Sequence, residues 1–264
     1  MPRRPRLKLA DIPLHIIQRG NNRSACFYAE EDYLFYLDHL GEACRKHGVD
    51  LHAYVLMTNH VHLLMTPKDG DGPSRVLKQL GQRYVQYINR TYRRSGTLWE
   101  GRFRSCLVGE EEYFFGCHRY IELNPVRAGM VTHPAEYRWS SYRRNAQGEA
   151  NDLVHPHALH LALGGDDATR CATYREFFRY QLDPGLVDQI RSATNGGYAL
   201  GSEPLRRLRP RLPHRLLLQR ARRLPLLQHP ADGGDRRPPG RSRPAPSLRA
   251  SMGALPAQAT ALLP

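Results

Sequence analysis

One segment decides the fold of this chain: Leu51-His52-Ala53-Tyr54-Val55-Leu56-Met57-Thr58-Asn59-His60-Val61-His62-Leu63-Leu64-Met65. It contains two short apolar runs, 51–57 and 60–65, separated by two polar residues, a pattern typical of a β-hairpin. In the second run, strand alternation places His60 and His62 on one face and the apolar residues between them on the other. The segment therefore predicts two paired strands that carry a His-x-His motif.

Strands and helices alternate on both sides of this hairpin. Apolar residues at strand or helix spacing, and turn signals such as Gly20-Asn21-Asn22, define their bounds. Ser74 is expected to cap the longest helix, whose apolar stripe is followed by Gly96 as its stop. The expected elements are a strand over 12–19, a helix over 30–46, the strands of the hairpin, a helix over 74–96, an extended stretch over 97–108 and a helix over 110–124 that Pro125 stops.

The order strand, helix, strand, strand, helix, strand, helix resembles a split β-α-β arrangement. It predicts an α+β fold, a ferredoxin-like antiparallel sheet with helices packed on one face. Smaller helical additions are expected further along. The expected domains are residues 1–145, a mostly helical extension over 146–203, and a tail over 204–264.

Positive charge is concentrated in this tail. Of the formal charge of +14 on 264 residues, segment 204–264 contributes +11, with thirteen arginines and two aspartates, so the remainder carries only +3. The segment has no aromatic residue, Val or Ile and holds 11 of the 20 prolines, a composition typical of disorder. Two interpretations stay open: an arginine-rich nucleic-acid-binding tail, or a translated out-of-frame stretch of GC-rich DNA.

Cysteine usage and hydropathy argue against several classes of protein. The five cysteines are scattered and form no C-x-x-C pair, which argues against a disulfide framework and against a zinc ribbon. No run of 18 apolar residues occurs, and the basic N-terminal stretch is not followed by an apolar one. We therefore expect a cytoplasmic protein with reduced thiols and no membrane partner.

The His-x-His motif is the first candidate for chemistry. Two imidazole nitrogens one strand step apart can share one metal ion, and the alternative is a pair of polar residues on a solvated sheet face. His155-Pro156-His157 has the same spacing, but its proline interrupts any strand ladder. We expect no metal ligand from that second motif.

Tyr120 and Asn124 form the second candidate. They are four residues apart on the expected helix, so the phenol and the carboxamide would project from one side. Packing in the core or at its rim is the alternative for a helical tyrosine. Tyr113 shares the same helical edge and is the rival position.

Together these motifs resemble those of the single-tyrosine HUH transposases, specifically the REP-associated tyrosine transposases of the IS200-like group. The matching segments are 56–62, 99–103 and 120–127, with further similarity over 16–23 and 139–142. The resemblance covers roughly residues 1–203, and the tail does not resemble the usual continuation of the family.

The resemblance implies an enzyme that cleaves and rejoins single-stranded or hairpin DNA of the REP type through a covalent 5′-phosphotyrosine intermediate. It implies that Tyr120 is the nucleophile and that His60, His62 and Asn124 bind a divalent metal ion. Two imidazoles and an amide oxygen leave positions open for water and phosphate oxygens, which suits Mg²⁺ or Mn²⁺. An unperturbed phenol is a poor nucleophile at neutral pH, so the metal ion or a base must assist it.

The expected partner is DNA, without a nucleotide cofactor, and the chain is expected to be a nucleoid-associated monomer or homodimer. Trp99 could stack on an unpaired base, or it could belong to the core. The alternative function is that of a catalytically inactive DNA-binding protein or regulator derived from a transposase. The candidate DNA-binding residues are Arg19, Asn21, Asn22, Arg23, Trp99, Arg102 and Arg104.

Overall fold

The computed structural model of the chain describes residues 7–109, 111–197 and 199–200. The chain divides into two compact units, residues 1–226 and 227–264, and every described residue lies in the first. The expectations about the tail therefore lie outside the described residues. The strands are β1 Leu14–Arg19, β2 Val49–Met57, β3 His60–Pro67, β4 Arg104–Val108 and β5 Ala199–Leu200, and the helices are α1 Glu30–His47, α2 Gly72–Thr91, α3 Glu111–Glu122, α4 Asn124–Arg127, α5 Tyr142–Gln147, α6 Ala158–Leu161, α7 Asp167–Glu176 and α8 Pro184–Gly196, with 3₁₀ turns at Asn21–Arg23 and Pro134–Glu136.

The five strands form one sheet in the order β2-β3-β1-β4-β5. The first four are antiparallel to their neighbours, and β5 pairs in parallel with β4. The hairpin β2–β3 is present where the sequence predicts it. The α+β class and the ferredoxin-like order of the first four strands are thus confirmed.

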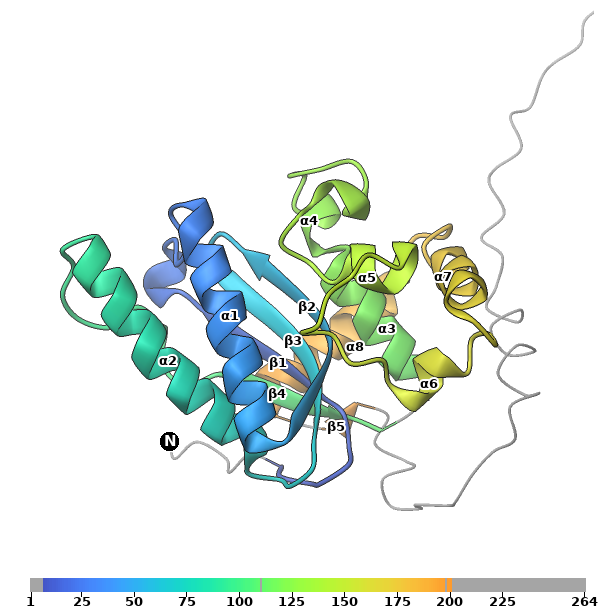
Figure 1. Cartoon of the computed structure of the whole chain (residues 1–264), viewed down its shortest axis with the longest axis horizontal. Coiled ribbons are helices and arrows are strands. Elements are labelled where there is room, and N and C mark those ends of the chain that lie inside the picture. Colours follow the sequence, from blue (N-terminus) through green and yellow to red (C-terminus); the bar gives the residue numbers. More distant parts are fainter. Residues whose placement is uncertain (1–6, 110, 198, 201–264) are drawn as a thin grey trace, which may run out of the picture. The chain divides into compact units, whose positions relative to one another are not determined.

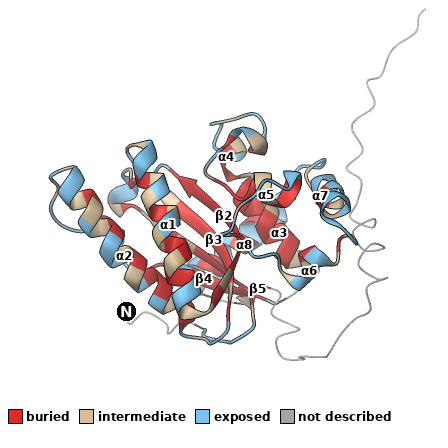
Figure 2. Ribbon diagram, viewed as in Figure 1, coloured by how far each residue is buried: buried red, intermediate tan, exposed pale blue. Residues whose placement is uncertain are grey.

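Helices cover both faces of this sheet (Figure 1). Ile16 and Leu63 point to the face that α1 and α2 cover, where they join one buried apolar cluster. Leu64 and Cys106 point to the other face and pack into a second cluster with α3 and α8. Buried residues accordingly lie on the sheet and on the helix sides that face it (Figure 2). The expected arrangement, with helices on one face, describes only half of the observed one.

The apolar stripe expected in α2 is buried, since Leu77, Leu80, Tyr84 and Ile88 are all at most 4% exposed. Its start differs from the prediction, because α2 begins at Gly72 rather than behind a Ser74 cap. Pro73 fits the first turn of a helix because its missing N–H needs no partner there. A Cβ at Gly72 would lie 2.8 Å from Cγ2 of Val49, so glycine permits this close approach of α2 to β2.

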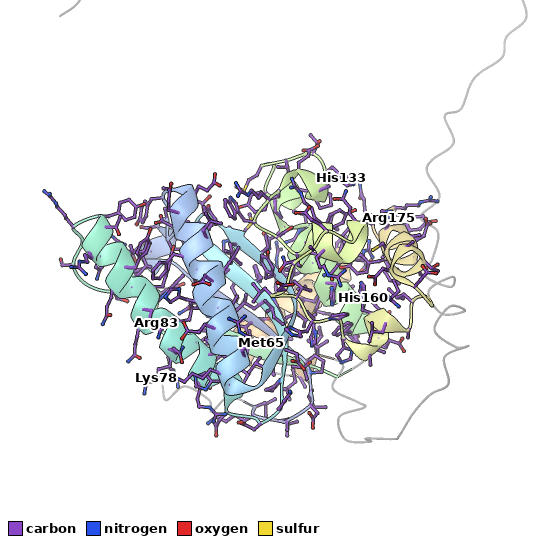
Figure 3. All side chains as sticks on the ribbon, viewed as in Figure 1. Met65, Lys78, Arg83, His133, His160 and Arg175 are labelled. Atoms are coloured by element: carbon purple, nitrogen blue, oxygen red, sulfur yellow. The ribbon has the colours of Figure 1, made fainter. Side chains whose placement is uncertain are left out.

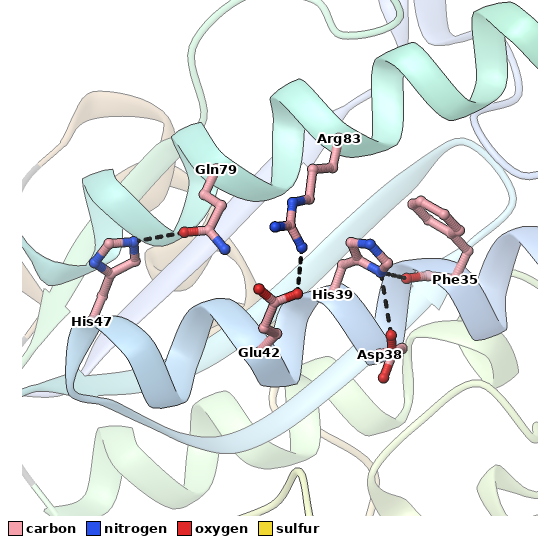
Figure 4. Close-up of polar contacts among 7 residues, drawn as sticks. All are labelled: Phe35, Asp38, His39, Glu42, His47, Gln79 and Arg83. Carbon is pink, nitrogen blue, oxygen red and sulfur yellow. Dashed lines mark hydrogen bonds and ion pairs between the residues drawn. The ribbon is translucent and has the colours of Figure 1, made fainter.

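Polar contacts join α1 and α2 along their exposed edge (Figure 4). Nε2 of His47 donates to Oε1 of Gln79 at 3.0 Å, and Arg83 pairs with Glu42. Lys78 and Arg83 lie on the exposed side of α2 (Figure 3). Exposed pairs of this kind contribute at most about 1 kcal/mol each, so the apolar seam holds the two helices together.

The helix expected over 110–124 is present, but it ends two residues earlier than expected. α3 ends at Glu122, and a separate short helix, α4, begins at Asn124 with Pro125 in its first turn. Proline starts the next helix here because its fixed φ suits that position. The extended stretch expected over 97–108 also forms a strand only from Arg104, after Gly101 with φ +111°.

All five cysteines are buried free thiols. Within the described residues, no helix is long and apolar enough to cross a membrane.

Candidate active site

A cavity of about 490 Å³ opens between the ends of β1, β3 and the helices on the second face of the sheet. It brings together Tyr120, both histidines of the His-x-His motif, Asn124 and a ring of arginines. The lining residues are His15, Ile17, Arg19, Arg23, His60, His62, Glu100, Gly101, Arg102, Arg104, Tyr120, Asn124, Arg127, Arg191, Thr194 and Asn195.

Strand pairing places the His-x-His motif in this cavity. Arg19 of β1 lies opposite His60 and Ile17 lies opposite His62, so these side chains share one face of the sheet. The two imidazole rings lie 5.0 Å apart, nearly perpendicular. His62 is only 2% exposed because α3 and α8 cover this face. The motif therefore does not lie on a solvated sheet face, which was the alternative interpretation.

Both imidazoles are held in the neutral form by their surroundings. Burial, followed by the charge of Arg19, lowers the pKa of His60 to about 4, although a hydrogen bond with the Asn124 side chain opposes that shift. Burial also lowers the pKa of His62 well below its usual value, and the neighbouring His15 and His60 add to this. Neutral imidazoles retain a lone pair, which is the form that binds a metal ion.

Tyr120 projects from α3 and lies beside the two histidines. Its side chain is 6% exposed, and its ring meets the ring of His62 edge-on at 5.5 Å. The guanidinium of Arg127 lies 4.4 Å from the ring centre, and its Nη1 donates to the backbone carbonyl of Tyr120 at 3.3 Å. Tyr120 and Asn124 thus reach one cavity from two helices, not from one as expected.

The rival tyrosine does not share this place. The hydroxyl of Tyr113 donates to Oε1 of Gln189 on α8 at 3.2 Å, and Tyr113 is not among the residues that line the cavity. The second His-x-His motif is also elsewhere: His155 is exposed, and Nδ1 of His157 accepts from the backbone N–H of Leu159 at the start of α6.

Four of the expected DNA-binding residues line the cavity, namely Arg19, Arg23, Arg102 and Arg104. Asn21 and Asn22 lie beside it in the turn after β1 and do not line it. Trp99 lies in the core, which was the alternative to base stacking: its side chain is only 6% exposed and its ring lies 6.0 Å from that of Tyr84.

Sequence reasoning missed His15, Arg127 and Thr194. His15 is an isolated histidine in β1, and its importance follows only from pairing with β3, which places it on the face of the His-x-His motif. Thr194 comes from α8, far along the chain, and no local pattern connects it to the site. Arg127 belongs to a matching segment, so its position after Tyr120 was a usable signal.

Comparison with known proteins finds similar sequences and structures. Residues 8–124 match the model of the family "Transposase IS200 like". The resemblance to the REP-associated tyrosine transposases is confirmed by a relative of that name. This relative is a Haemophilus influenzae protein, 24% identical over 119 residues that cover 41% of this chain and 67% of the relative.

Two solved structures are also similar. One is a REP-associated tyrosine transposase bound to a REP hairpin, with 17% identity and a TM-score of 0.49 over 60% of this chain and 93% of that one. The other is a Deinococcus radiodurans protein described as a transposase, with 20% identity and a TM-score of 0.32 over 42% of this chain and 89% of that one.

Proposed function

We propose that this chain is a metal-dependent transposase that cleaves and rejoins single-stranded or hairpin DNA through a covalent bond to Tyr120. The observation that carries the proposal is the meeting of four side chains in one cavity: Tyr120, His60, His62 and Asn124. They come from β3, α3 and α4, so folding rather than proximity in sequence brings them together. Hairpins of the REP type are the proposed substrate, because the similar proteins are named as REP-associated tyrosine transposases.

The donor set fits a divalent cation. His60 and His62 offer neutral imidazole nitrogens, and Asn124 offers an amide oxygen. The described residues contain no cluster of three His, Cys, Asp or Glu that could hold a metal ion, so the third donor has to be of another type. A neutral set with open positions suits Mg²⁺ or Mn²⁺, and such an ion would polarise the scissile phosphate and stabilise the leaving oxygen.

Tyr120 performs the covalent step. Its phenol oxygen bonds to the phosphorus, the bond from phosphorus to the 3′ oxygen breaks, and the phenol proton ends on the released 3′ hydroxyl. The 5′-phosphotyrosine product keeps the energy of the phosphodiester bond, so the reverse attack by a 3′ hydroxyl rejoins DNA without a nucleotide cofactor. Arg127 contacts the tyrosine through its ring and its backbone carbonyl, and its positive charge would face the phosphate that Tyr120 attacks.

The other arginines of the cavity suit the DNA backbone. Arg19 ends β1 and Arg23 lies in the turn after it, Arg102 precedes β4 and Arg104 begins it, and Arg191 comes from α8. Cationic side chains around a site neutralise phosphates without reading sequence. We infer that the strand crosses the cavity between these walls.

Incubation of the full chain with end-labelled hairpin DNA and Mn²⁺, followed by a denaturing gel, tests this function. With a 5′ label we expect a shortened strand, and with a 3′ label we expect a band that migrates with the protein and disappears after protease treatment. Retarded DNA on a native gel without cleavage on the denaturing one would favour the inactive DNA-binding regulator instead.

A further inference from the structure

Each histidine of the candidate metal site hydrogen-bonds through Nδ1 to a neighbour, His60 to Asn59 and His62 to His15. Asn59 bonds directly to a backbone carbonyl, and His15 bonds to the Thr194 hydroxyl, which in turn bonds to one. Imidazole binds metal through a nitrogen that bears a lone pair, and the hydrogen bond made by the other nitrogen decides which one that is. The hydrogen-bond partners of His60 and His62 therefore determine whether their Nε2 atoms can act as ligands.

Asn59 decides which ring nitrogen of His60 carries the hydrogen. The Asn59 Nδ2 donates to the backbone carbonyl of Arg23 at 3.1 Å, and this orients the amide so that its oxygen faces the ring. That oxygen, Oδ1, lies 2.6 Å from Nδ1 of His60. An amide oxygen can only accept, so Nδ1 carries the hydrogen and Nε2 keeps the lone pair.

A longer series of hydrogen bonds decides which ring nitrogen of His62 carries the hydrogen. The Thr194 hydroxyl donates its single hydrogen to the carbonyl of Ile190 at 2.7 Å, so it accepts from Nδ1 of His15, 2.9 Å away. His15 is 1% exposed, and its ring nitrogens are hydrogen-bonded to a hydroxyl and to another imidazole rather than to a carboxylate that would stabilise a charged ring, so the ring is neutral and its Nε2 has no hydrogen. Nε2 of His15 lies 2.9 Å from Nδ1 of His62, which must donate, and this leaves the lone pair on Nε2 of His62.

We propose that Asn59, His15 and Thr194 are positioning residues that fix both histidines with Nε2 free to bind a divalent cation. This inference rests on the proposed function for the identity of the ligand. Thr194 lies on α8, outside the residues that match the transposase family, so the C-terminal part of the described chain supports the site. His15 is 1% exposed and hydrogen-bonds to both Thr194 and His62, so its ring is held in one position.

The protonated nitrogens can be read directly from ¹⁵N-labelled full chain without metal. Two-dimensional ¹H–¹⁵N spectra of the imidazoles at pH 7.5 should show His15, His60 and His62 with hydrogen on Nδ1 and an unprotonated Nε2. A hydrogen on Nε2 of His60 or His62 would overturn the proposal. This measurement needs neither DNA nor activity.

Thr194→Val and Thr194→Ser provide the matched pair of variants. Valine cannot accept from His15, so His15 can place its hydrogen on Nε2 and force His62 into the form that cannot bind metal. We expect Mn²⁺ affinity, measured by calorimetry without DNA, to fall by about tenfold in Thr194→Val and to be retained in Thr194→Ser. The Nε2–H signal of His62 should appear in the valine variant alone.

The outcomes separate the two proposals. Equal Mn²⁺ affinity and an unchanged His62 spectrum in a folded Thr194→Val variant would overturn the positioning role alone. Failure of the wild-type chain to bind Mn²⁺ would overturn the proposed metal site, even if the histidines have the expected form.

Discussion

At the scale of single residues, burial and partners decide what each histidine can do. His62 is enclosed and hydrogen-bonded to a neutral ring, whereas His155 is exposed on a loop. His157 instead caps a short helix. The identical spacing of the two His-x-His motifs therefore carries little information by itself, and the strand context of the first motif carries most of it.

We predict that His60→Ala abolishes cleavage of hairpin DNA by the full chain, because it removes one of the two imidazoles proposed as metal ligands. His155→Ala is the control and should cleave at the wild-type rate, since its side chain is exposed. Initial rates with labelled DNA and Mn²⁺ measure both. An active His60→Ala variant beside an inactive His155→Ala variant would mean that the second motif is the functional one.

The candidate residues of the site could be predicted unevenly. His60 and His62 follow from strand alternation, and Tyr120 and Asn124 from a local motif. The link between His15 and Thr194 spans 179 residues, so only the folded chain brings them together. Burial of Trp99 likewise depends on how α2 packs. A local pattern of aromatic and basic residues does not predict that packing.

At the scale of elements, α8 connects the core to the cavity. Its Ile190 is fully buried against the second apolar cluster, while Thr194 and Asn195 line the cavity one turn later. Oδ1 of Asn195 also accepts from Nη1 of Arg104 at 2.8 Å, which joins α8 to β4.

We predict that Ile190→Ala lowers the free energy of unfolding by about 2 to 5 kcal/mol, since it leaves a cavity in a closed core. Asp188→Ala on the exposed side of α8 should change it by less than about 0.5 kcal/mol. Urea titrations monitored by circular dichroism give both values. Equal stability of the two variants would show that α8 does not pack on the sheet as described.

A buried carboxyl group ties α3 to the segment after it. Glu122 is completely buried two residues after Tyr120, and its oxygens accept from Ser141, Asn145 and Tyr174 at 2.6, 2.9 and 2.8 Å. Burial nonetheless raises its pKa from 4.5 to about 7, against these three hydrogen bonds. The folded state thus binds this proton more tightly than the unfolded state does.

We predict that this group makes stability depend on pH. Its contribution is complete below pH 4.5 and is lost as the pH rises through about 7, a change of about 3 kcal/mol. In Glu122→Gln that dependence should be absent. Free energies of unfolding from pH 4 to 8 measure it, and parallel curves for the two proteins would contradict the assignment.

The elements themselves were largely predictable, because local periodicity defines them. The hairpin, α1 and the stripe of α2 follow from spacing alone. Two features do not: Pro125 starts α4 rather than simply ending a helix, and the second face of the sheet is covered by α3 and α8. Which face a helix covers depends on long-range packing that sequence spacing does not encode.

At the scale of the whole molecule, most of the net positive charge lies after residue 203, outside the described residues. We predict that truncation after Glu203 leaves the melting temperature and the cleavage rate at saturating DNA unchanged. Affinity for non-specific DNA should fall and depend less steeply on salt, because arginines that contact phosphates are removed. Fluorescence anisotropy from 50 to 300 mM salt measures this, and a much lower melting temperature would show that the tail is structural.

Covalent attachment through Tyr120 is the central claim, and mapping the adduct tests it most directly. Trypsin places Tyr120 on the peptide 120–127 and Tyr113 on the peptide 105–119, so mass spectrometry distinguishes them. We predict a nucleotide on 120–127 in the wild type and in Tyr113→Phe, and neither adduct nor cleavage in Tyr120→Phe, which should still bind hairpin DNA. An adduct on 105–119, cleavage by Tyr120→Phe, or a cleaved strand without attached protein would contradict the claim.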